Sequence, residues 1–200
     1  IINAYGDRLA CVIMEPVRNT LPKDDFLEYV RDGIHKVGGL LVFDEITIGW
    51  RYRFGGSHLA LGVNPDMAVF AKAMGNGHPI AAVIGTKEAM HGTEDSFISS
   101  TYWTESVGPV AALATLKKME ETRVWEHAEK MGLALIDIWN KLAEKHDIPA
   151  VAGGMPCLAH LSYTKYPLEL KTLYTVLMLK EGFLGNNACY LTLAHTDEIM

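Results

Sequence analysis

Two short apolar runs, each followed by charged residues, stand out in the hydrophobic pattern of this chain. Leu40–Phe43 is followed by Asp44 and Glu45, and Met67–Ala71 is followed by Lys72. Four or five consecutive apolar residues between polar or glycine-rich turns are typical of strands buried in a parallel sheet. Ligands of open α/β sheets bind outside the carboxyl ends of the strands. We therefore expect a carboxylate and an amine at one edge of the same sheet.

The pattern before Asp44 predicts a strand, a helix and a second strand. Leu9–Met14 is an apolar run that stops at a Glu-Pro pair, because proline cannot donate to a strand ladder. A helix then begins at Asp24 or Asp25, either of which can cap it, and extends to about Val37. Its expected apolar face contains Phe26, Val30, Ile34 and Val37. The short connections predict parallel strands with a right-handed crossover.

The pattern after Asp44 predicts a reversal of chain direction within the sheet. The long connection 47–65 is rich in glycine and aromatic residues, and it is expected to be helical near His58–Leu61. Asp66–Ala71 is the next expected strand, and Ile80–Ile84 is the one after it. The turn between these two strands is short, so the last strand is expected to be antiparallel.

The second half of the chain predicts two helices and then a small α+β lobe. The helix Glu105–Glu121 has its apolar spacing at Val107, Val110, Ala111, Ala114, Leu116 and Met119. The helix Trp125–His146 has an apolar stripe of Met131, Leu135, Ile138, Trp139 and Leu142. Short strands at 151–154, 157–163 and 190–193 with a helix at 169–182 complete the lobe. We therefore predict a sheet domain at 1–122, a connecting helix at 123–148 and a small domain at 149–200.

Composition limits the classes of partner and compartment. Hydrophobic residues make up 49% of the 200 residues and the net charge is −6, so nucleic acid and anionic membranes are not expected partners. No apolar run approaches the ~18 residues of a membrane span. The three cysteines form no CxxC pair and suggest no metal site, which favours a reduced, cytoplasmic setting. Because the chain begins at Ile1 rather than methionine, we interpret it as a fragment of something longer.

The charged residues at the sheet edge are more informative as a pair than singly. Asp44 alone is more typical of a carboxylate that caps the next turn, and Lys72 alone of a solvated loop lysine. Buried charges, however, occur almost only when they are paired or functional. The turn Gly75–Ile80 contains the first two glycines of a dinucleotide fingerprint but lacks its final small residue. A dinucleotide-dependent enzyme therefore stays open as an alternative.

Several motifs in a fixed order resemble one enzyme family. They are Val-Phe-Asp-Glu-Ile at 42–46, Gly-Trp-Arg at 49–51, Pro-Asp at 65–66 and Ala-Lys at 71–72. Together with Glu-Pro-Val at 15–17 and Ser-Thr-Tyr-Trp-Thr-Glu at 100–105, they resemble class III pyridoxal-phosphate aminotransferases, and most closely the glutamate-1-semialdehyde aminomutase-like members. The resemblance implies an α/β protein of fold type I, with part of a large, mostly parallel sheet and a small C-terminal lobe.

The resemblance also implies roles for four residues. Lys72 would form a Schiff base with pyridoxal 5′-phosphate, and Asp44 would pair with the pyridine nitrogen of this cofactor. Ile46 would pack against one face of the ring. Thr101 would reach the cofactor phosphate of the neighbouring subunit in a homodimer. The implied function is an aminotransferase or aminomutase that moves an amino group between a donor and a carbonyl acceptor.

Three departures from the family pattern limit what the resemblance implies. The N-terminal half of the family, with its main phosphate-binding loop, is absent, so this fragment alone should bind the cofactor weakly or not at all. Trp50 stands where phenylalanine is commoner, and Ser100 where glycine usually precedes the threonine. A non-catalytic piece that dimerises or regulates on the same scaffold is therefore the alternative function.

Overall fold

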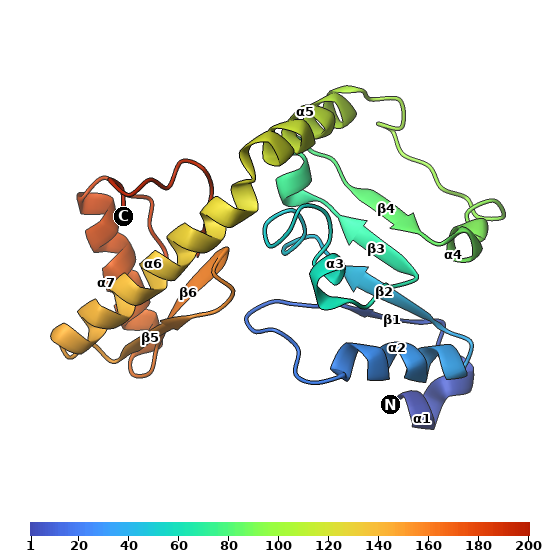
Figure 1. Cartoon of the computed structure of the whole chain (residues 1–200), viewed down its shortest axis with the longest axis horizontal. Helices are drawn as coiled ribbons and strands as arrows, with labels where there is room; N and C mark the ends of the chain where they lie inside the picture. Colours follow the sequence, from blue (N-terminus) through green and yellow to red (C-terminus); the bar gives the residue numbers. More distant parts are fainter. The chain divides into compact units, whose positions relative to one another are not determined.

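The protein is described by a computed structural model covering residues 1–6 and 8–200, which form two compact units. The first unit is Ile1–Thr122 and the second is Arg123–Met200. The first unit contains a four-stranded sheet in the order β1-β2-β3-β4, and the second a three-stranded sheet in the order β5-β6-β7 (Figure 1). The strands of the first sheet are β1 (Cys11–Met14), β2 (Leu40–Asp44), β3 (Met67–Phe70) and β4 (Ala82–Gly85).

The strand directions of the first sheet confirm the sequence prediction. β1 pairs with β2 and β2 with β3 in parallel, whereas β3 and β4 are antiparallel. The helical elements of this unit are α1 (Ile2–Tyr5), η1 (Gly6–Arg8), α2 (Phe26–Lys36), α3 (His58–Leu61), η2 (Lys72–Met74), α4 (Lys87–His91) and α5 (Val107–Thr122). The sheet therefore consists of a βαβ unit extended by a third parallel strand and closed by one reversed strand.

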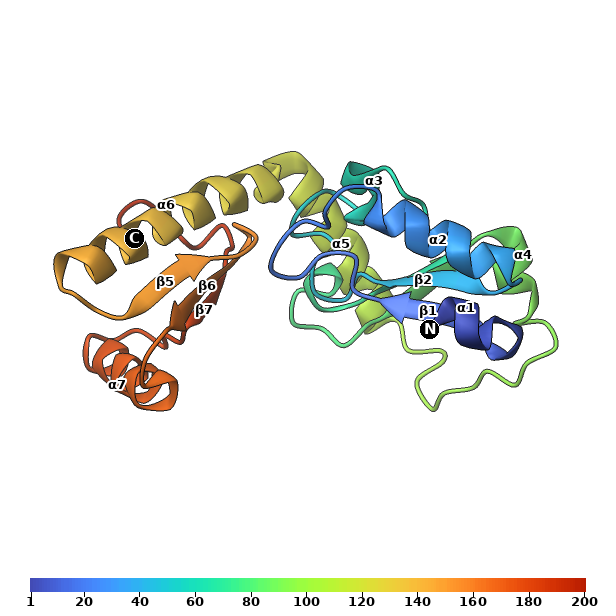
Figure 2. The ribbon, with the colours of Figure 1, turned by 90° about the horizontal axis from the view of Figure 1, so that it is seen from below.

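α2 lies along one face of the sheet (Figure 2), and its buried side agrees with the prediction in part. Leu27 and Ile34 are buried against Leu41 and Phe43 of β2, whereas Phe26 is 50% exposed. Val30 also packs against this cluster, so the predicted positions 30 and 34 are confirmed. Leu27 is buried in place of Phe26, and Val37 is exposed. Asp25 occupies the N-cap position, yet its side chain makes no capping hydrogen bond, so the predicted side-chain cap is wrong.

The buried side of α5 likewise agrees with the prediction only in part. Its buried residues are Gly108 and Ala112, whereas Val107 and Val110 are exposed. A side-chain carbon on Gly108 would lie 2.9 Å from the carbonyl oxygen of Pro79, so the helix approaches the backbone closely at that position. Ala112 packs with Ala68, Phe70 and Met74. The close approach selects small residues at these positions. Leu116 also packs against this cluster, as predicted, whereas Val107 and Val110 are exposed.

The second unit packs one long helix against its antiparallel sheet. Its elements are α6 (Val124–Lys145), β5 (Ala150–Gly153), β6 (Leu158–Tyr163), α7 (Pro167–Lys180) and β7 (Ala188–Tyr190). α6 buries Met131 and Trp139 as predicted, but Leu142 is exposed and small residues complete the contact face. The last strand lies nearer the N-terminus than the predicted 190–193. None of the helices among residues 1–6 and 8–200 has the length and apolar content needed to cross a membrane.

Candidate functional site

The carboxylate and the amine predicted at one sheet edge both lie there. β2 ends at Asp44, and β3 ends at Phe70 just before Lys72 begins the 3-10 turn η2. The two strands are parallel, with Asp44 opposite Val69, and their arrowheads point the same way in Figure 1. Lys72 has a φ of 46°, in the left-handed region that non-glycine residues rarely adopt. Such strain is concentrated at functional sites in proteins.

A threonine that the sequence analysis did not single out links the two strand ends. The Nζ of Lys72 donates a hydrogen bond of 2.8 Å to Oγ1 of Thr47. Thr47 belongs to the loop that follows Asp44, and it is only 3% exposed, whereas Lys72 is an exposed residue. Nothing in the sequence pattern distinguishes Thr47 from the other polar residues of this loop, so only the three-dimensional structure reveals the contact.

Asp44 caps the turn after β2 and still has an available acceptor atom. Its Oδ1 accepts a 2.9 Å hydrogen bond from the backbone N–H of Ile46, and both residues are half-buried. Its Oδ2 has no hydrogen-bond partner among residues 1–6 and 8–200. Asp44 therefore caps the turn after its strand, as expected of a strand-end carboxylate. Its second oxygen can also accept a hydrogen bond from a ligand.

The adjacent carboxylate, Glu45, is fully buried and saturated with hydrogen bonds. It accepts from the backbone N–H and hydroxyl of Ser57 and from the backbone N–H of His58, and it lies 3.1 Å from Nδ1 of His58. Burial acts to raise the pKa of Glu45, but the hydrogen bonds from His58 and Ser57 together outweigh it and lower this pKa. Glu45 therefore closes the loop 45–58 as a buried carboxylate, a role that the sequence analysis missed.

Thr101 is not brought to Asp44 and Lys72 within this chain. It lies in the connection between α4 and α5 and is exposed. No hydrogen bond or ion pair joins its side chain to the sheet edge in the described part of the chain. Its expected role toward a neighbouring subunit stays a prediction.

The dinucleotide alternative is not supported by the turn that suggested it. A dinucleotide fingerprint requires its glycines to open a helix between parallel strands. Here the glycines follow the short turn η2 and lead into β4, which is antiparallel to β3. A side-chain carbon on Gly75 would lie 2.2 Å from the carbonyl oxygen of His78, so the glycine is explained by a tight turn.

Trp50, the departure from the family's usual phenylalanine, has a packing role in this unit. Its ring centroid lies 5.3 Å from that of Phe54 and 5.7 Å from that of Phe70. Its buried Nε1 has no hydrogen-bond partner among residues 1–6 and 8–200. Trp50 therefore fills the space beside β3.

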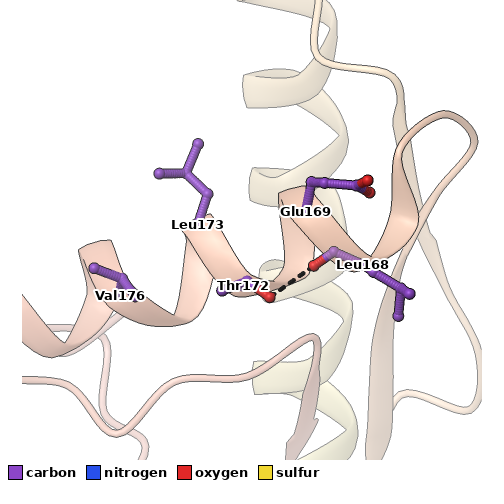
Figure 3. Close-up of a pocket in the computed structure, with 5 residues that line it drawn as sticks. All are labelled: Leu168, Glu169, Thr172, Leu173 and Val176. Atoms are coloured by element: carbon purple, nitrogen blue, oxygen red, sulfur yellow. Dashed lines mark hydrogen bonds between the residues drawn. The ribbon is translucent and has the colours of Figure 1, made fainter.

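A shallow apolar depression in the second unit offers no comparable chemistry. It is formed by one helix alone, and Figure 3 shows its lining residues Leu168, Glu169, Thr172, Leu173 and Val176. The hydroxyl of Thr172 donates to the carbonyl oxygen of Leu168 within the same helix. The depression is therefore lined by one carboxylate, Glu169, without an amine beside it, unlike the edge of the first sheet.

Comparisons with known proteins agree on one family. The class-III aminotransferase profile matches residues 1–165. The chain is 32% identical to a 3-aminobutyryl-CoA aminotransferase of Cloacimonas acidaminovorans, over 99% of this chain and 51% of the relative. It is also 32% identical to a glutamate-1-semialdehyde 2,1-aminomutase of Clostridium botulinum, over 99% of this chain and 52% of the relative. The chain thus spans about half the length of the curated relatives that it matches.

Solved structures give the same fold. The FumI protein of Sphingopyxis sp. MTA144, solved as its pyridoxal-phosphate internal aldimine form, superimposes with a TM-score of 0.92 at 25% identity, covering 99% of this chain and 50% of FumI. A β-phenylalanine aminotransferase of Variovorax paradoxus superimposes with a TM-score of 0.83 at 22% identity, covering 99% and 51%. The two units therefore have the arrangement of elements found in about half of a fold type I transferase.

The residues at the sheet edge fit the cofactor of this family. Pyridoxal 5′-phosphate carries an aldehyde that reacts with a primary amine and a pyridine nitrogen that pairs with a carboxylate. Lys72 offers such an amine, and Asp44 offers a carboxylate oxygen without a partner in the described residues. The chain belongs to the class-III aminotransferase family, which uses pyridoxal 5′-phosphate and has the α/β fold type I.

Proposed function

We propose that the full-length protein containing this chain is a pyridoxal-phosphate-dependent aminotransferase or aminomutase with Lys72 and Asp44 as its catalytic residues. The observation that carries this proposal is the hydrogen bond between Lys72 and Thr47, which holds the amine beside the loop that begins at Asp44. When bound, the cofactor supplies an electron sink for the negative charge left at a deprotonated substrate carbon. The protein supplies the attachment point, the ring environment and the proton carrier.

Each proposed role follows from the chemistry of the side chain. Lys72 would hold the cofactor through its amine, and this amine would carry a proton when it is not bonded to the cofactor. The open oxygen of Asp44 favours the protonated pyridine nitrogen, because a nearby negative charge stabilises a cation. Ile46 offers an apolar contact to the ring without competing hydrogen bonds. Thr101 offers a hydroxyl and a backbone N–H to phosphate oxygens.

Exposed apolar residues support a homodimer with shared active sites. Phe97 is 96% exposed and Trp103 69%, and both flank Thr101 in the segment between α4 and α5. Val107, Val110 and Leu113 extend this exposed surface along α5. Apolar patches of this kind mark surfaces that another chain covers. The proposed homodimer places Thr101 in the active site of the neighbouring subunit.

The substrates are proposed only as classes. An amino donor and a carbonyl acceptor follow from the reaction of the family. The relatives include both aminotransferases and aminomutases, so the proposal covers both reactions. A cytoplasmic location is proposed from the three cysteines, none of which is in a disulfide within the described residues.

The decisive experiment traps the cofactor on the full-length protein. The protein is incubated with pyridoxal 5′-phosphate, reduced with borohydride and digested, and the modified peptide is identified by mass spectrometry. We expect a stable pyridoxyl group on Lys72, and none in the Lys72→Ala variant. A protein that takes up no cofactor would instead support a non-catalytic role on this scaffold. A modification on a different lysine would overturn the assignment of Lys72.

A further inference from the structure

We propose that Thr47 is a positioning residue for the amine of Lys72. Its hydroxyl holds Nζ whenever the amine is not bonded to the cofactor, so the amine stays next to the position from which it reacts. The proposal rests on the function proposed for Lys72. The direct support for the proposal is the 2.8 Å hydrogen bond that Nζ of the exposed Lys72 donates to Oγ1 of the buried Thr47.

Thr47 is a rigid acceptor because its own backbone is fixed in two ways. The guanidinium of Arg51 donates from Nη1 to the carbonyl oxygen of Thr47. The turn around Thr47 is closed by a 2.9 Å hydrogen bond from the N–H of Gly49 to the carbonyl oxygen of Glu45. A side-chain carbon on Gly49 would lie 2.6 Å from that same oxygen, so the turn is too tight for a larger residue.

The same loop is tied to the strand that leads to Lys72. The backbone N–H of Glu45 donates a 2.9 Å hydrogen bond to the carbonyl oxygen of Val69 in β3. The Glu45 carboxylate, fully buried, fixes the other end of the loop through Ser57 and His58. The position of the Thr47 hydroxyl relative to the backbone of Lys72 is therefore set by hydrogen bonds on both sides of it.

Lys72 needs such a partner because its side chain is long and exposed. A lysine in solvent populates many rotamers, and only a few of them point the amine toward a given atom. A hydroxyl can accept a hydrogen bond from an ammonium group, and it can also donate one to a neutral amine. One residue can thus hold the lysine before and after it transfers a proton, without adding a charge to the site.

The test compares Thr47→Val with Thr47→Ser in the full-length, cofactor-free protein. Pyridoxal 5′-phosphate is added, borohydride is injected after increasing delays, and the modified fraction of Lys72 is measured by mass spectrometry. We expect capture to be about 5- to 10-fold slower in Thr47→Val and within about twofold of the natural protein in Thr47→Ser. Thr172→Val, which removes a hydroxyl from the exposed helix α7, should leave the capture rate unchanged.

A second readout separates positioning from folding. If Thr47 positions the amine, Thr47→Val lowers kcat by a similar factor while the KM for the amino donor stays the same, and the final modified fraction still reaches that of the natural protein. A lower final fraction with an unchanged rate would show a loss of folded sites and would overturn the inference. Thr47→Ala provides the same comparison if Thr47→Val does not fold.

The outcomes distinguish this inference from the proposed function. If the natural protein captures cofactor on Lys72 and Thr47→Val captures it equally fast, only the role of Thr47 is wrong. If the natural protein captures no cofactor on Lys72, the proposed function fails, and the inference fails with it. Slow capture in Thr47→Val with recovery in Thr47→Ser supports both.

Discussion

Two adjacent carboxylates at the end of β2 differ in how much of their hydrogen-bonding capacity the chain uses. Glu45 is fully buried and receives hydrogen bonds from Ser57 and His58. Asp44 is half-buried and receives one, from the N–H of Ile46. Successive side chains near a strand end point to opposite sides. Of two residues with the same chemistry, one therefore stabilises the loop and the other is left for a ligand.

The proposed role of Asp44 predicts a selective loss of turnover. In the full-length protein, Asp44→Asn should still capture cofactor on Lys72, because the amine is unchanged. The kcat should fall by about 100-fold or more, since a neutral amide does not favour the protonated pyridine nitrogen. Steady-state kinetics and borohydride trapping measure the two quantities separately. Equal turnover in the variant would contradict the assignment.

The lowered pKa of Glu45 predicts how this residue contributes to stability at different pH values. A carboxyl with a lower pKa in the folded state stabilises that state above its ordinary pKa of 4.5. The contribution is lost as the pH falls through the lower, folded-state pKa. Glu45→Gln should therefore melt at a lower temperature than the natural protein at pH 7, by the equivalent of about 1–3 kcal/mol. The difference should shrink below pH 4.5, and a constant difference over this range would refute the charge effect.

At the scale of elements, the sequence predicts where helices and strands lie better than which side of a helix is buried. The predicted order and direction of the first four strands are confirmed, because uninterrupted apolar runs mark the strands and the short turn before β4 leaves few alternatives for its direction. The buried sides of α5 and α6 were mispredicted in part. Periodicity gives most weight to large apolar residues, whereas these helices make close contacts through residues such as Gly108 and Gly132. Such a contact depends on the partner backbone, which sequence spacing does not reveal.

The candidate site also contains residues that the sequence predicts and residues that it does not. Asp44 and Lys72 were predictable, because each directly follows an apolar strand and both strands were expected to be parallel. The roles of Thr47 and of the Glu45–His58 contact were not predictable, because the partner of Thr47 follows a different strand and His58 lies at the far end of the loop. Sequence pattern therefore indicates which residues reach the sheet edge, and only the folded loop shows which of them hold the others in place.

The packing of α6 gives a prediction at the scale of elements. A side-chain carbon on Gly132 would lie 1.9 Å from the carbonyl oxygen of Pro156, a backbone atom that cannot rotate away. Gly132→Ala should therefore displace α6 from its sheet and destabilise the second unit by about 2–4 kcal/mol. Gly153→Ala is the matched control, because no atom lies within 4 Å of its added carbon. Thermal unfolding of the full-length variants makes the comparison, and equal melting temperatures would contradict the close contact.

At the scale of the whole molecule, we propose that this chain contributes part of a cofactor-binding site. It spans about half of its curated relatives, and Lys72 is exposed in it. In the proposed enzyme, Asp44, Ile46 and Lys72 would contact the ring and the aldehyde of the cofactor. The proposed homodimer would supply further contacts to the phosphate from the second subunit. Thr101, exposed between two exposed aromatic residues, is the residue of this chain that we assign to that second subunit's site.

A mixed dimer tests this exchange of Thr101 between subunits. Full-length Lys72→Ala has no attachment point for the cofactor, and Thr101→Val should bind it about 10-fold more weakly through loss of a hydrogen bond to phosphate. At a low cofactor concentration, each homodimer is therefore expected to be inactive or weakly active. In a mixed dimer, the subunit carrying Thr101→Val keeps Lys72, and its partner contributes a natural Thr101, so one complete site forms.

Differently tagged subunits, co-expressed and purified through both tags, provide the mixed dimer for measurement. If Thr101 serves the neighbouring site, the mixed dimer should bind cofactor with natural affinity at one site and recover about half of the natural activity. If Thr101 serves its own subunit, the one site that retains Lys72 keeps the valine, so its affinity remains at the level of Thr101→Val and the activity per dimer is about half that of the Thr101→Val homodimer. The same preparation also tests the homodimer itself, because a monomeric protein would not be retained on the second tag.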